Sequence, residues 1–577
     1  MNFATAIEKR WTVKDTPDAK LVEELAISLN IRPELASLLA QRGIDSFESA
    51  KSFFRPSLSD IHDPFLMKDM DKAVDRLVKA VESKEFIMVF GDYDVDGTTA
   101  VSLVYSFLHK FHEEVIYYIP DRYKEGYGLS YAGIDYAHDN GVTLMITLDC
   151  GIKAVDKVRY AKEKGIDVII CDHHRPGSEL PPAVAVLDAK QEDCHYPYKE
   201  LCGCGVGFKF MQAYCQRTGR SEDEVLEYID LVAVAIGADI VPVTGENRIL
   251  MYMGLQKVNE SPCKGLKALL GVAGAKGTLS VTDLVFILAP RINAAGRIHH
   301  GANAVKLLTE PEAGQLEELA KEIDNFNKER RDLDKVITQD ALEILQNDPS
   351  YADMQSTVVY KESWHKGVVG IVASRLIEQV YRPTIVLTES NGFATGSARS
   401  IAHFDVYEAI DACSDLLINF GGHTHAAGMT LKIEDVPEFR RRFEESVRER
   451  MKAEWLIPEL KADMEIPLEC VDHKFLSILK QMGPFGPGNM NPVFYSKRCK
   501  ERGFAKIVGE HHLKLQIISD GVERPIKAIA FKQAHHMEHV RAGRTFNMLY
   551  TLEENEWNGM VDLQLNVKDI KAEENPW

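Results

Sequence analysis

The chain of 577 residues is too long for one hydrophobic core, which predicts three or four domains. Its 45% hydrophobic and 27% charged residues are typical of an ordinary soluble globular protein. No apolar run reaches about 18 residues, so we expect no membrane span. The N-terminus lacks the apolar core of a secretion signal, so we expect a cytoplasmic location. The net charge of −19 argues against a nucleic-acid binder, although a basic groove can lie within an acidic total.

The ten cysteines are scattered rather than spaced as a disulfide framework, which predicts reduced thiols. One cluster could be imagined around zinc: Cys194, His195, Cys202, Cys204 and Cys215. Its spacings match no common structural zinc pattern, so we favour the interpretation without zinc.

Residues 1–66 form a small lead-in with helical stretches at 19–29 and 32–42 and no recognisable chemistry. Apolar residues then recur at helical spacing over 70–81, which predicts an amphipathic helix. Strands are predicted at 86–90, 115–119, 143–148 and 168–171, with helices such as 154–164 between them. This alternation predicts a parallel sheet with helices on both faces, in which ligands bind beyond the carboxyl ends of the strands.

Acidic residues and histidines lie at those strand ends. Asp92, Asp94 and Asp96 fill the turn after the first strand, before a helix expected from residue 98. Asp94 and Asp96 are two apart on an extended segment and can aim at one point. Further groups end the third strand, the fourth strand and an apolar helix over 225–238: Asp149, Asp172-His173-His174 and Asp239.

Each of these acids alone is more simply a helix cap or a turn residue. Together they would repel one another or take up protons unless a cation or a salt bridge neutralised them. Oxygen-rich ligands with few imidazoles suit Mg²⁺ or Mn²⁺ better than zinc. The pattern therefore predicts a divalent-metal site on one rim of the sheet.

Residues 286–297 combine small residues with Arg291 and Arg297, and either hold phosphate or form a packing loop with two solvated arginines. A long charged segment from 311 to about 347 carries an apolar stripe and predicts a connecting helix. Strands at 356–360, 384–387 and 392–400 around a helix at 368–380 predict a smaller α/β domain. Its glycine-rich segments around Arg399 and His423 let backbone approach a ligand, although a Gly-Gly-His turn is a weak signal alone.

From about residue 456 the pattern changes to short alternating strands, at 505–508, 513–518, 526–531, 545–552 and 560–567. Five such strands predict a small barrel of the oligonucleotide-binding (OB) type. Basic residues at 497–502, with His511, His512 and Lys514, flank it, and a solvated charged face is a comparably simple interpretation of them.

Asp92-Tyr93-Asp94-Val95-Asp96-Gly97, Asp149, Asp172-His173-His174 and Asp239, in that order at element ends, resemble the motifs of the DHH phosphoesterase superfamily. Three further motifs narrow the resemblance to the single-strand-specific 5′→3′ DNA exonucleases of that superfamily: Arg291-Ile292-Asn293-Ala294-Ala295-Gly296-Arg297, Trp364-His365-Lys366-Gly367-Val368-Val369-Gly370 and Gly421-Gly422-His423. The match covers residues 70 to 570, and the combination of motifs is highly specific.

The resemblance implies an α/β protein in five parts: a lead-in (1–66), a parallel-sheet catalytic domain (67–305), a long connecting helix (306–350), a smaller α/β substrate-binding domain (351–455) and a C-terminal OB-like β-barrel (456–577). It also implies two divalent cations, Mn²⁺ or Mg²⁺, held by Asp94, Asp96, Asp149, His173 and Asp239. Asp149 is expected to bridge the two ions and His174 to lie beside the scissile phosphate, so the expected catalytic residues are Asp149, His173 and His174. Asp92 is expected to support the turn.

The resemblance further implies a path for the substrate. Arg122 and Tyr127 are expected to lie along the DNA. The other expected substrate-binding residues hold phosphates or lie near the cleft: Arg291, Asn293, Ser397, Arg399 and His423.

One position departs from the family pattern. Many relatives have a histidine four residues before the first metal aspartate, where this chain has Phe90. We hypothesise that one metal site therefore loses a nitrogen ligand and binds its ion more loosely.

The implied function is single-stranded-DNA-specific 5′→3′ exonuclease activity in DNA repair and recombination, by two-metal catalysis. A monomer that receives its substrate from a helicase or a single-strand-binding protein is expected. A first alternative is a phosphoesterase of the same superfamily that acts on pyrophosphate, cyclic dinucleotides or short oligonucleotides; the barrel and the chain length argue against it. A second is a catalytically inactive module that docks on replication or repair proteins; the complete set of acids with His173 argues against it.

Overall fold

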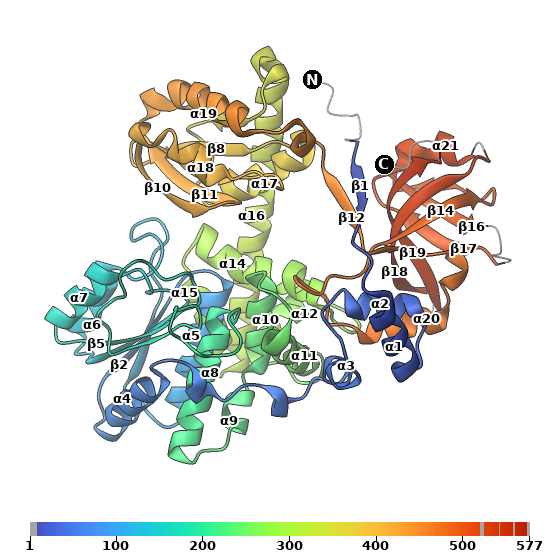
Figure 1. Ribbon diagram of the computed structural model, residues 1–577. Helices are drawn as coiled ribbons and strands as arrows, with labels where there is room; N and C mark the ends of the chain where they lie inside the picture. The colour runs from blue at the N-terminus through green and yellow to red at the C-terminus, as the bar shows by residue number, and fades with distance from the viewer. Residues whose placement is uncertain (1–7, 520–523, 542, 558–559, 574–577) are drawn as a thin grey trace. The chain divides into compact units, whose positions relative to one another are not determined.

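The computed structural model describes residues 8–519, 524–541, 543–557 and 560–573 (Figure 1). The chain divides into two compact units. The first unit contains Ser46–Glu329 and Gln481–Asn491, and the second contains 1–45, Arg330–Lys480 and Pro492–Trp577. One continuous helix of 35 residues, α16 (Ala313–Asn347), contributes to both, which confirms the predicted long connecting helix. Within the described ranges, no helix has the length and apolar character needed to cross a bilayer.

The first unit is built on a parallel five-stranded sheet with the order β3-β2-β4-β5-β6. The strands are β2 (Ile87–Gly91), β3 (Val115–Tyr118), β4 (Leu144–Leu148), β5 (Asp167–Cys171) and β6 (Ala185–Leu187). The first four were predicted, whereas the three-residue strand β6 was not. Because β3 lies on one side of β2 and β4 on the other, the chain reverses direction across the sheet at β2, and ligand sites in such sheets lie at this switch point.

Side chains of the central strands alternate between two hydrophobic cores. On one face Ile87 and Val89 join the core that contains α4 (Met70–Glu82), α5 (Val95–His109) and α8 (Gly203–Thr218). On the other, Met88 and Phe90 join the core that contains α6 (Tyr131–Asp139) and α7 (Val155–Glu163). The sheet is therefore covered on both faces, as the alternation of strands and helices predicted.

The remaining helices of the first unit extend the larger core. Helix α10 (Ile229–Ala238) is buried along nearly its whole length, and a π-helical turn, η3 (Leu284–Leu288), continues directly into α14 (Ala289–Ile298). The others are α3 (Phe47–Phe54), α9 (Asp223–Leu226), α11 (Gly245–Glu260), α12 (Lys264–Ala273), α13 (Val281–Asp283) and α15 (Ala302–Thr309).

The second unit contains a mixed five-stranded sheet with the order β10-β11-β9-β8-β7, in which only β7 and β8 run parallel. Its strands are β7 (Thr357–Tyr360), β8 (Thr384–Ser390), β9 (Phe393–Arg399), β10 (Leu417–His423) and β11 (Ala426–Leu431). Its helices are α17 (Val369–Val380), α18 (Val406–Asp411) and α19 (Val436–Arg450). The residues of the Gly-Gly-His motif, Gly421–His423, end strand β10, and the chain turns at the next two positions.

A seven-stranded sheet, β13-β14-β18-β19-β17-β16-β15, closes on itself through an additional β14–β16 pairing, as expected for a small barrel. The strands are β13 (Met464–Glu465), β14 (Phe494–Glu501), β15 (Lys506–Val508), β16 (His512–Ile518), β17 (Ile526–Ala530), β18 (Phe546–Trp557) and β19 (Met560–Ala572). All five predicted strands are present. Most of the basic segment at 497–502, taken as a flank, lies within β14.

The N-terminal lead-in also belongs in part to the second unit. Strand β1 (Arg10–Val13) pairs in parallel with β12 (Glu459–Ala462), and Trp11 donates a hydrogen bond from Nε1 to Asp569 at 2.9 Å. The accompanying helices are α1 (Ala19–Leu29), α2 (Pro33–Ala40), α20 (His473–Gln481) and α21 (Met537–Arg541). The predicted five-part division stays a prediction.

Candidate metal centre and active site

The turn that follows β2 is shaped by a helix cap. Asp94 is the N-cap of α5 and accepts a hydrogen bond from the Gly97 amide at 3.0 Å. The helix therefore begins at Val95, earlier than expected from the sequence, and Asp96 lies in its first turn instead of on an extended segment. A Cβ atom on Gly97 would lie 2.5 Å from the Asp92 carbonyl oxygen, so only glycine permits this tight turn.

Asp96 is fully buried and holds the start of another helix. Its two carboxylate oxygens accept hydrogen bonds from the amides of Gly203 at 2.6 Å and Cys204 at 2.7 Å, the first residues of α8. A carboxylate at this position also interacts favourably with the helix dipole. One of the same oxygens lies 3.7 Å from Nε2 of His173, so Asp96 connects α8 to the histidine cluster.

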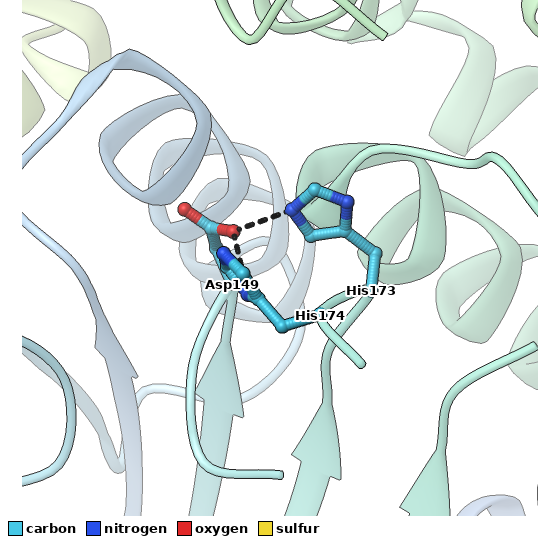
Figure 2. A group of neighbouring side chains, drawn as sticks. All are labelled: Asp149, His173 and His174. Atoms are coloured by element: carbon cyan, nitrogen blue, oxygen red, sulfur yellow. Dashed lines mark hydrogen bonds and ion pairs between the residues drawn. The ribbon is translucent and has the colours of Figure 1, made fainter. Parts of the chain in front are cut away.

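Asp149 follows β4 and has a left-handed backbone with φ 57°, which is uncommon for a residue other than glycine. Its Oδ1 lies 3.1 Å from Nε2 of His173 and 3.9 Å from Nδ1 of His174. Figure 2 shows both imidazoles directed at this one oxygen. A Cβ on Gly203 would lie 2.6 Å from the Asp149 Cβ, so the start of α8 packs directly on this aspartate.

Asp172 orients the two histidines and is saturated with hydrogen bonds. It accepts from the amides of Ile152, His173 and His174 and from Nδ1 of His174, the last at 2.7 Å. Burial alone would raise the pKa of Asp172, but the bond to His174 and its charge lower it to about 2. Burial likewise opposes a charge on His174, but the bond to Asp172 raises the pKa of His174 to about 9. Asp172 and His174 therefore form an ion pair.

Asp239 stands at the C-terminal end of α10, and its Oδ2 lies 3.6 Å from Nε2 of His173. His173 is thus shared between two groups whose ligand atoms all lie within 4.8 Å of one another: Asp149, His173 and His174 in one, and Asp96, His173 and Asp239 in the other. The expectation from the family resemblance that Asp149 bridges the two ions stays a prediction. Among the described residues, no such group contains a cysteine.

The charges of this centre fit a cation. Burial, followed by the neighbouring carboxylates, raises the pKa of Asp96 to about 7 and of Asp239 to about 8, and raises the pKa of Asp149 well above its usual range. Aspartates stay ionised in such a place only when positive charge is supplied. Carboxylate oxygens are the donors that suit Mg²⁺ and Mn²⁺, and they outnumber the imidazole nitrogens in this centre. The residues present therefore fit a divalent-metal site.

Two of the predicted DNA-path residues reach this centre. The hydroxyl of Tyr127 lies 3.2 Å from Nε2 of His174 and donates to the Asp149 carbonyl at 3.3 Å. The guanidinium of Arg122 lies over the Tyr93 ring, 4.8 Å from its centre, and Tyr93 contacts Tyr127 edge to face. Tyr93 was missed as a site residue, although its place between Asp92 and Asp94 was a usable signal.

Helix α14 packs on the same turn, because a Cβ on Gly296 would lie 2.6 Å from the Tyr93 carbonyl oxygen. Arg291 donates from Nε to Asp324 at 3.0 Å and from a terminal nitrogen to the Ile287 carbonyl at 2.7 Å, so it is tied to its neighbours rather than solvated. Asn293 is half-buried two residues further along the helix.

The other predicted substrate residues form a separate cluster in the second unit. Arg399 donates to the hydroxyl of Ser397 at 2.6 Å, and both lie on β9. His423 is exposed at the end of β10 and pairs with Ala426 on the neighbouring strand β11. Ala426 pairs on its other side with Arg399 of β9, so one residue of β11 separates His423 from Arg399. A Cβ on Gly370 would lie 2.9 Å from a guanidinium nitrogen of Arg399, so the glycine at this position lets the arginine lie close to α17.

Phe90 lies in the hydrophobic core rather than among the carboxylates. It is fully buried and stacks on Tyr118, with 5.5 Å between ring centres. The hypothesis of a looser metal site stays a prediction. Sequence reasoning also missed Gly203 and Cys204, whose amides hold Asp96; the close glycine spacing at 203–207 was the signal for a tightly approached helix.

Three family models match the chain: the DHH family, N-terminal domain, over residues 86–236, the DHHA1 domain over 353–449, and the RecJ OB domain over 462–569. The single-stranded-DNA-specific exonuclease RecJ of Bacillus subtilis (strain 168) is 39% identical over 573 residues, which cover 99% of this chain and 72% of that protein. The exonuclease of the same name from Escherichia coli (strain K12) is 32% identical over 572 residues, 95% of this chain and 98% of that protein.

Solved structures agree. RecJ in complex with Mn²⁺ from Thermus thermophilus superposes with a TM-score of 0.84 at 29% identity, covering 97% of this chain and 79% of that one. A second structure, exonuclease RecJ bound to manganese, has a TM-score of 0.59 at 33% identity, covering 68% of this chain and 98% of that one. Relatives matched along nearly the whole chain, together with the Asp-His-His motif at the centre of the carboxylate cluster, show that the chain belongs to the RecJ family of DHH exonucleases.

Proposed function

We propose that this protein is a single-stranded-DNA-specific 5′→3′ exonuclease that hydrolyses phosphodiester bonds with two divalent cations, Mn²⁺ or Mg²⁺, in DNA repair and recombination. The observation that carries the proposal is the centre in which carboxylate oxygens of three aspartates lie 3.1 to 3.7 Å from Nε2 of His173: Asp96, Asp149 and Asp239. The family's exonucleases and their Mn²⁺ and Mg²⁺ complexes support the activity and the metals.

The cation ligands in this proposal are Asp94, Asp96, Asp149, Asp239 and His173. When bound, divalent cations activate the attacking water and neutralise charge on the phosphodiester and its leaving oxygen. The amides of Gly203 and Cys204 fix the Asp96 carboxylate, and the packing of α8 fixes Asp149, so the ligands are oriented before a cation binds.

His174 contributes positive charge beside the scissile phosphate. In the metal-free protein the hydrogen bond to Asp172 raises the pKa of His174 to about 9 despite burial, which favours an imidazole with protons on both nitrogens. Asp172 accepts the proton on Nδ1, so Nε2 points toward the Tyr127 hydroxyl and can donate to a phosphate oxygen that takes the place of that hydroxyl.

The remaining residues bind the strand. Arg122 and Tyr127 lie at the centre and bind DNA on the strand's path. Arg291 and Asn293 on α14 and the Ser397, Arg399 and His423 cluster bind substrate phosphates. The OB domain adds a grip that does not depend on base sequence. The protein acts in the cytoplasm as a monomer that receives single strands from a helicase or a single-strand-binding protein.

Incubation with 5′-phosphorylated single-stranded DNA and Mn²⁺ or Mg²⁺ tests the proposal. We expect release of mononucleotides from the 5′ end, no release from blunt duplex or cyclic dinucleotides, and loss of activity in EDTA. The variant Asp149→Ala should bind DNA but not cleave it. Cleavage by this variant, or a preference for cyclic dinucleotides, would refute the proposal.

A further inference from the structure

Two apolar side chains beside the metal centre are left largely exposed. Among the large apolar residues described in the first unit, Phe286 and Ile240 are the most exposed, at 71% and 68%. Single exposed apolar residues are common on protein surfaces, so exposure alone indicates nothing. These two differ because each stands on irregular backbone next to the carboxylate cluster.

Ile240 directly follows the expected metal ligand Asp239 and has a φ of 61°. It occupies the left-handed position just beyond the end of α10, where helices normally place glycine or asparagine. A β-branched residue is strongly disfavoured there, and such outliers gather at functional sites. Glycine would adopt this backbone conformation at lower cost. The presence of isoleucine therefore suggests that its side chain has a function.

Phe286 lies in the π-helical turn η3, in which the Ala289 amide donates to the Leu284 carbonyl. π-Helical turns within α-helices are rare and occur frequently at functional sites. This turn continues into α14, which carries Arg291 and Asn293. Phe286 therefore lies about two turns before Asn293 on one continuous helical segment.

The two irregular elements are packed together. A Cβ on Gly237 in the last turn of α10 would lie 3.5 Å from Cγ2 of Val285 and 3.8 Å from Cβ of Leu284. The glycine therefore brings the end of α10, with Asp239 and Ile240, against the π-helical turn. Phe286 and Ile240 consequently lie on adjoining elements at the Asp239 end of the cluster.

We propose that Phe286 and Ile240 form an apolar platform for a nucleobase of the single strand, adjacent to the phosphate at the metal centre. The inference rests on the proposed function and adds to it a contact with a base rather than with a phosphate. Every base has an apolar π-face, and stacking on an aromatic ring is tolerant of sequence. In duplex DNA that face is covered by the neighbouring base pairs, so the platform favours an unstacked single strand.

A coupling experiment tests the platform. Wild type and Phe286→Ala are compared by kcat/KM on 5′-phosphorylated oligothymidylates in which one abasic site is moved along the strand, one nucleotide at a time. We expect one position at which base removal lowers the wild-type kcat/KM roughly 5- to 150-fold, the range for one base stacked on an aromatic ring. At that position Phe286→Ala should lose nothing further, and Phe286→Trp should keep the wild-type pattern. Ile240→Gly should reproduce the loss in weaker form.

Phe47→Ala is the matched control, because Phe47 is a 50% exposed phenylalanine on α3 in the same unit. It should behave as wild type. Equal losses for Phe286→Ala at every abasic position, or none on intact DNA, would overturn the platform. Wild-type protein that releases no nucleotide from any single strand would instead refute the proposed function.

Discussion

The substitution Gly203→Ala should inactivate the protein by displacing two metal ligands at once. The added Cβ would lie 2.6 Å from Cβ, 2.8 Å from Cα and 2.9 Å from Oδ1 of Asp149. Carbon atoms in ordinary contact are about 3.5 to 4 Å apart, so Asp149 and the start of α8 must separate by roughly 1 Å. The Gly203 and Cys204 amides move with the helix, and they hold Asp96. A misplacement of about 1 Å costs on the order of 100-fold in rate.

Rates of nucleotide release from 5′-labelled single strands, with Mn²⁺ titrations by calorimetry, measure this effect. We expect kcat to fall about 100-fold and Mn²⁺ affinity to fall with it, while binding of single-stranded DNA is largely retained. Gly271→Ala on α12 is the control, since that helical glycine has no atom within 4 Å of the added Cβ. Wild-type activity and Mn²⁺ affinity in Gly203→Ala would show that the close approach of α8 does not position the ligands.

Three further predictions concern the metals, pH and stability. Because Phe90 supplies no nitrogen ligand, Mn²⁺ titration without substrate should reveal one tight and one weak or empty site, and two equally tight sites would contradict this. The folded pKa of His174, raised to about 9 from 6.5, means that its pairing with Asp172 stabilises fully below pH 6.5 and is lost as pH rises through 9. In EDTA, the melting-temperature deficit of Asp172→Asn should therefore shrink above pH 9, and a pH-independent deficit would refute the pairing. Lys209→Met leaves buried Glu246 without its ion-pair partner at 2.9 Å and should destabilise the first unit by about 3–5 kcal/mol in urea unfolding. Adding Glu246→Gln to this variant should recover part of the lost stability. An unchanged unfolding midpoint in Lys209→Met would count against a stabilising pair.

The parallel sheet and its rim could be predicted because buried strands read as continuous apolar runs with acids directly after them. Asp149 and Asp239 were placed correctly at element ends by this pattern alone. The start of α5 could not be predicted. Asp94 was expected to be a metal ligand, but it is also the N-cap that begins the helix, and the sequence alone does not show this second role. Strand β6 is too short, at three residues, to show a period.

The contacts that organise the centre come from residues far apart in the sequence, and no local pattern predicts them. The amides of Gly203 and Cys204 meet Asp96 from 107 and 108 positions away. Glycines in a helix reduce its stability by about 1 kcal/mol each, so the run at 203–207 contradicts helix propensity. The glycine run could be interpreted as a sign that another part of the chain packs closely on this helix. The sequence did not show that this part is Asp149.

Three irregular backbone positions lie at or next to this one centre. Asp149 and Ile240 adopt left-handed conformations and Phe286 lies in a π-helical turn, although regular structure would cost less at each position. A left-handed conformation costs a residue other than glycine about 1–2 kcal/mol, and surrounding structure must hold it in place. For Asp149 that support is the Tyr127 hydroxyl on its carbonyl and the packing of Gly203 on its side chain. At these three positions local propensity fails where the fold presents a carboxylate or an apolar side chain to the proposed substrate, and such local failures are expected at functional sites.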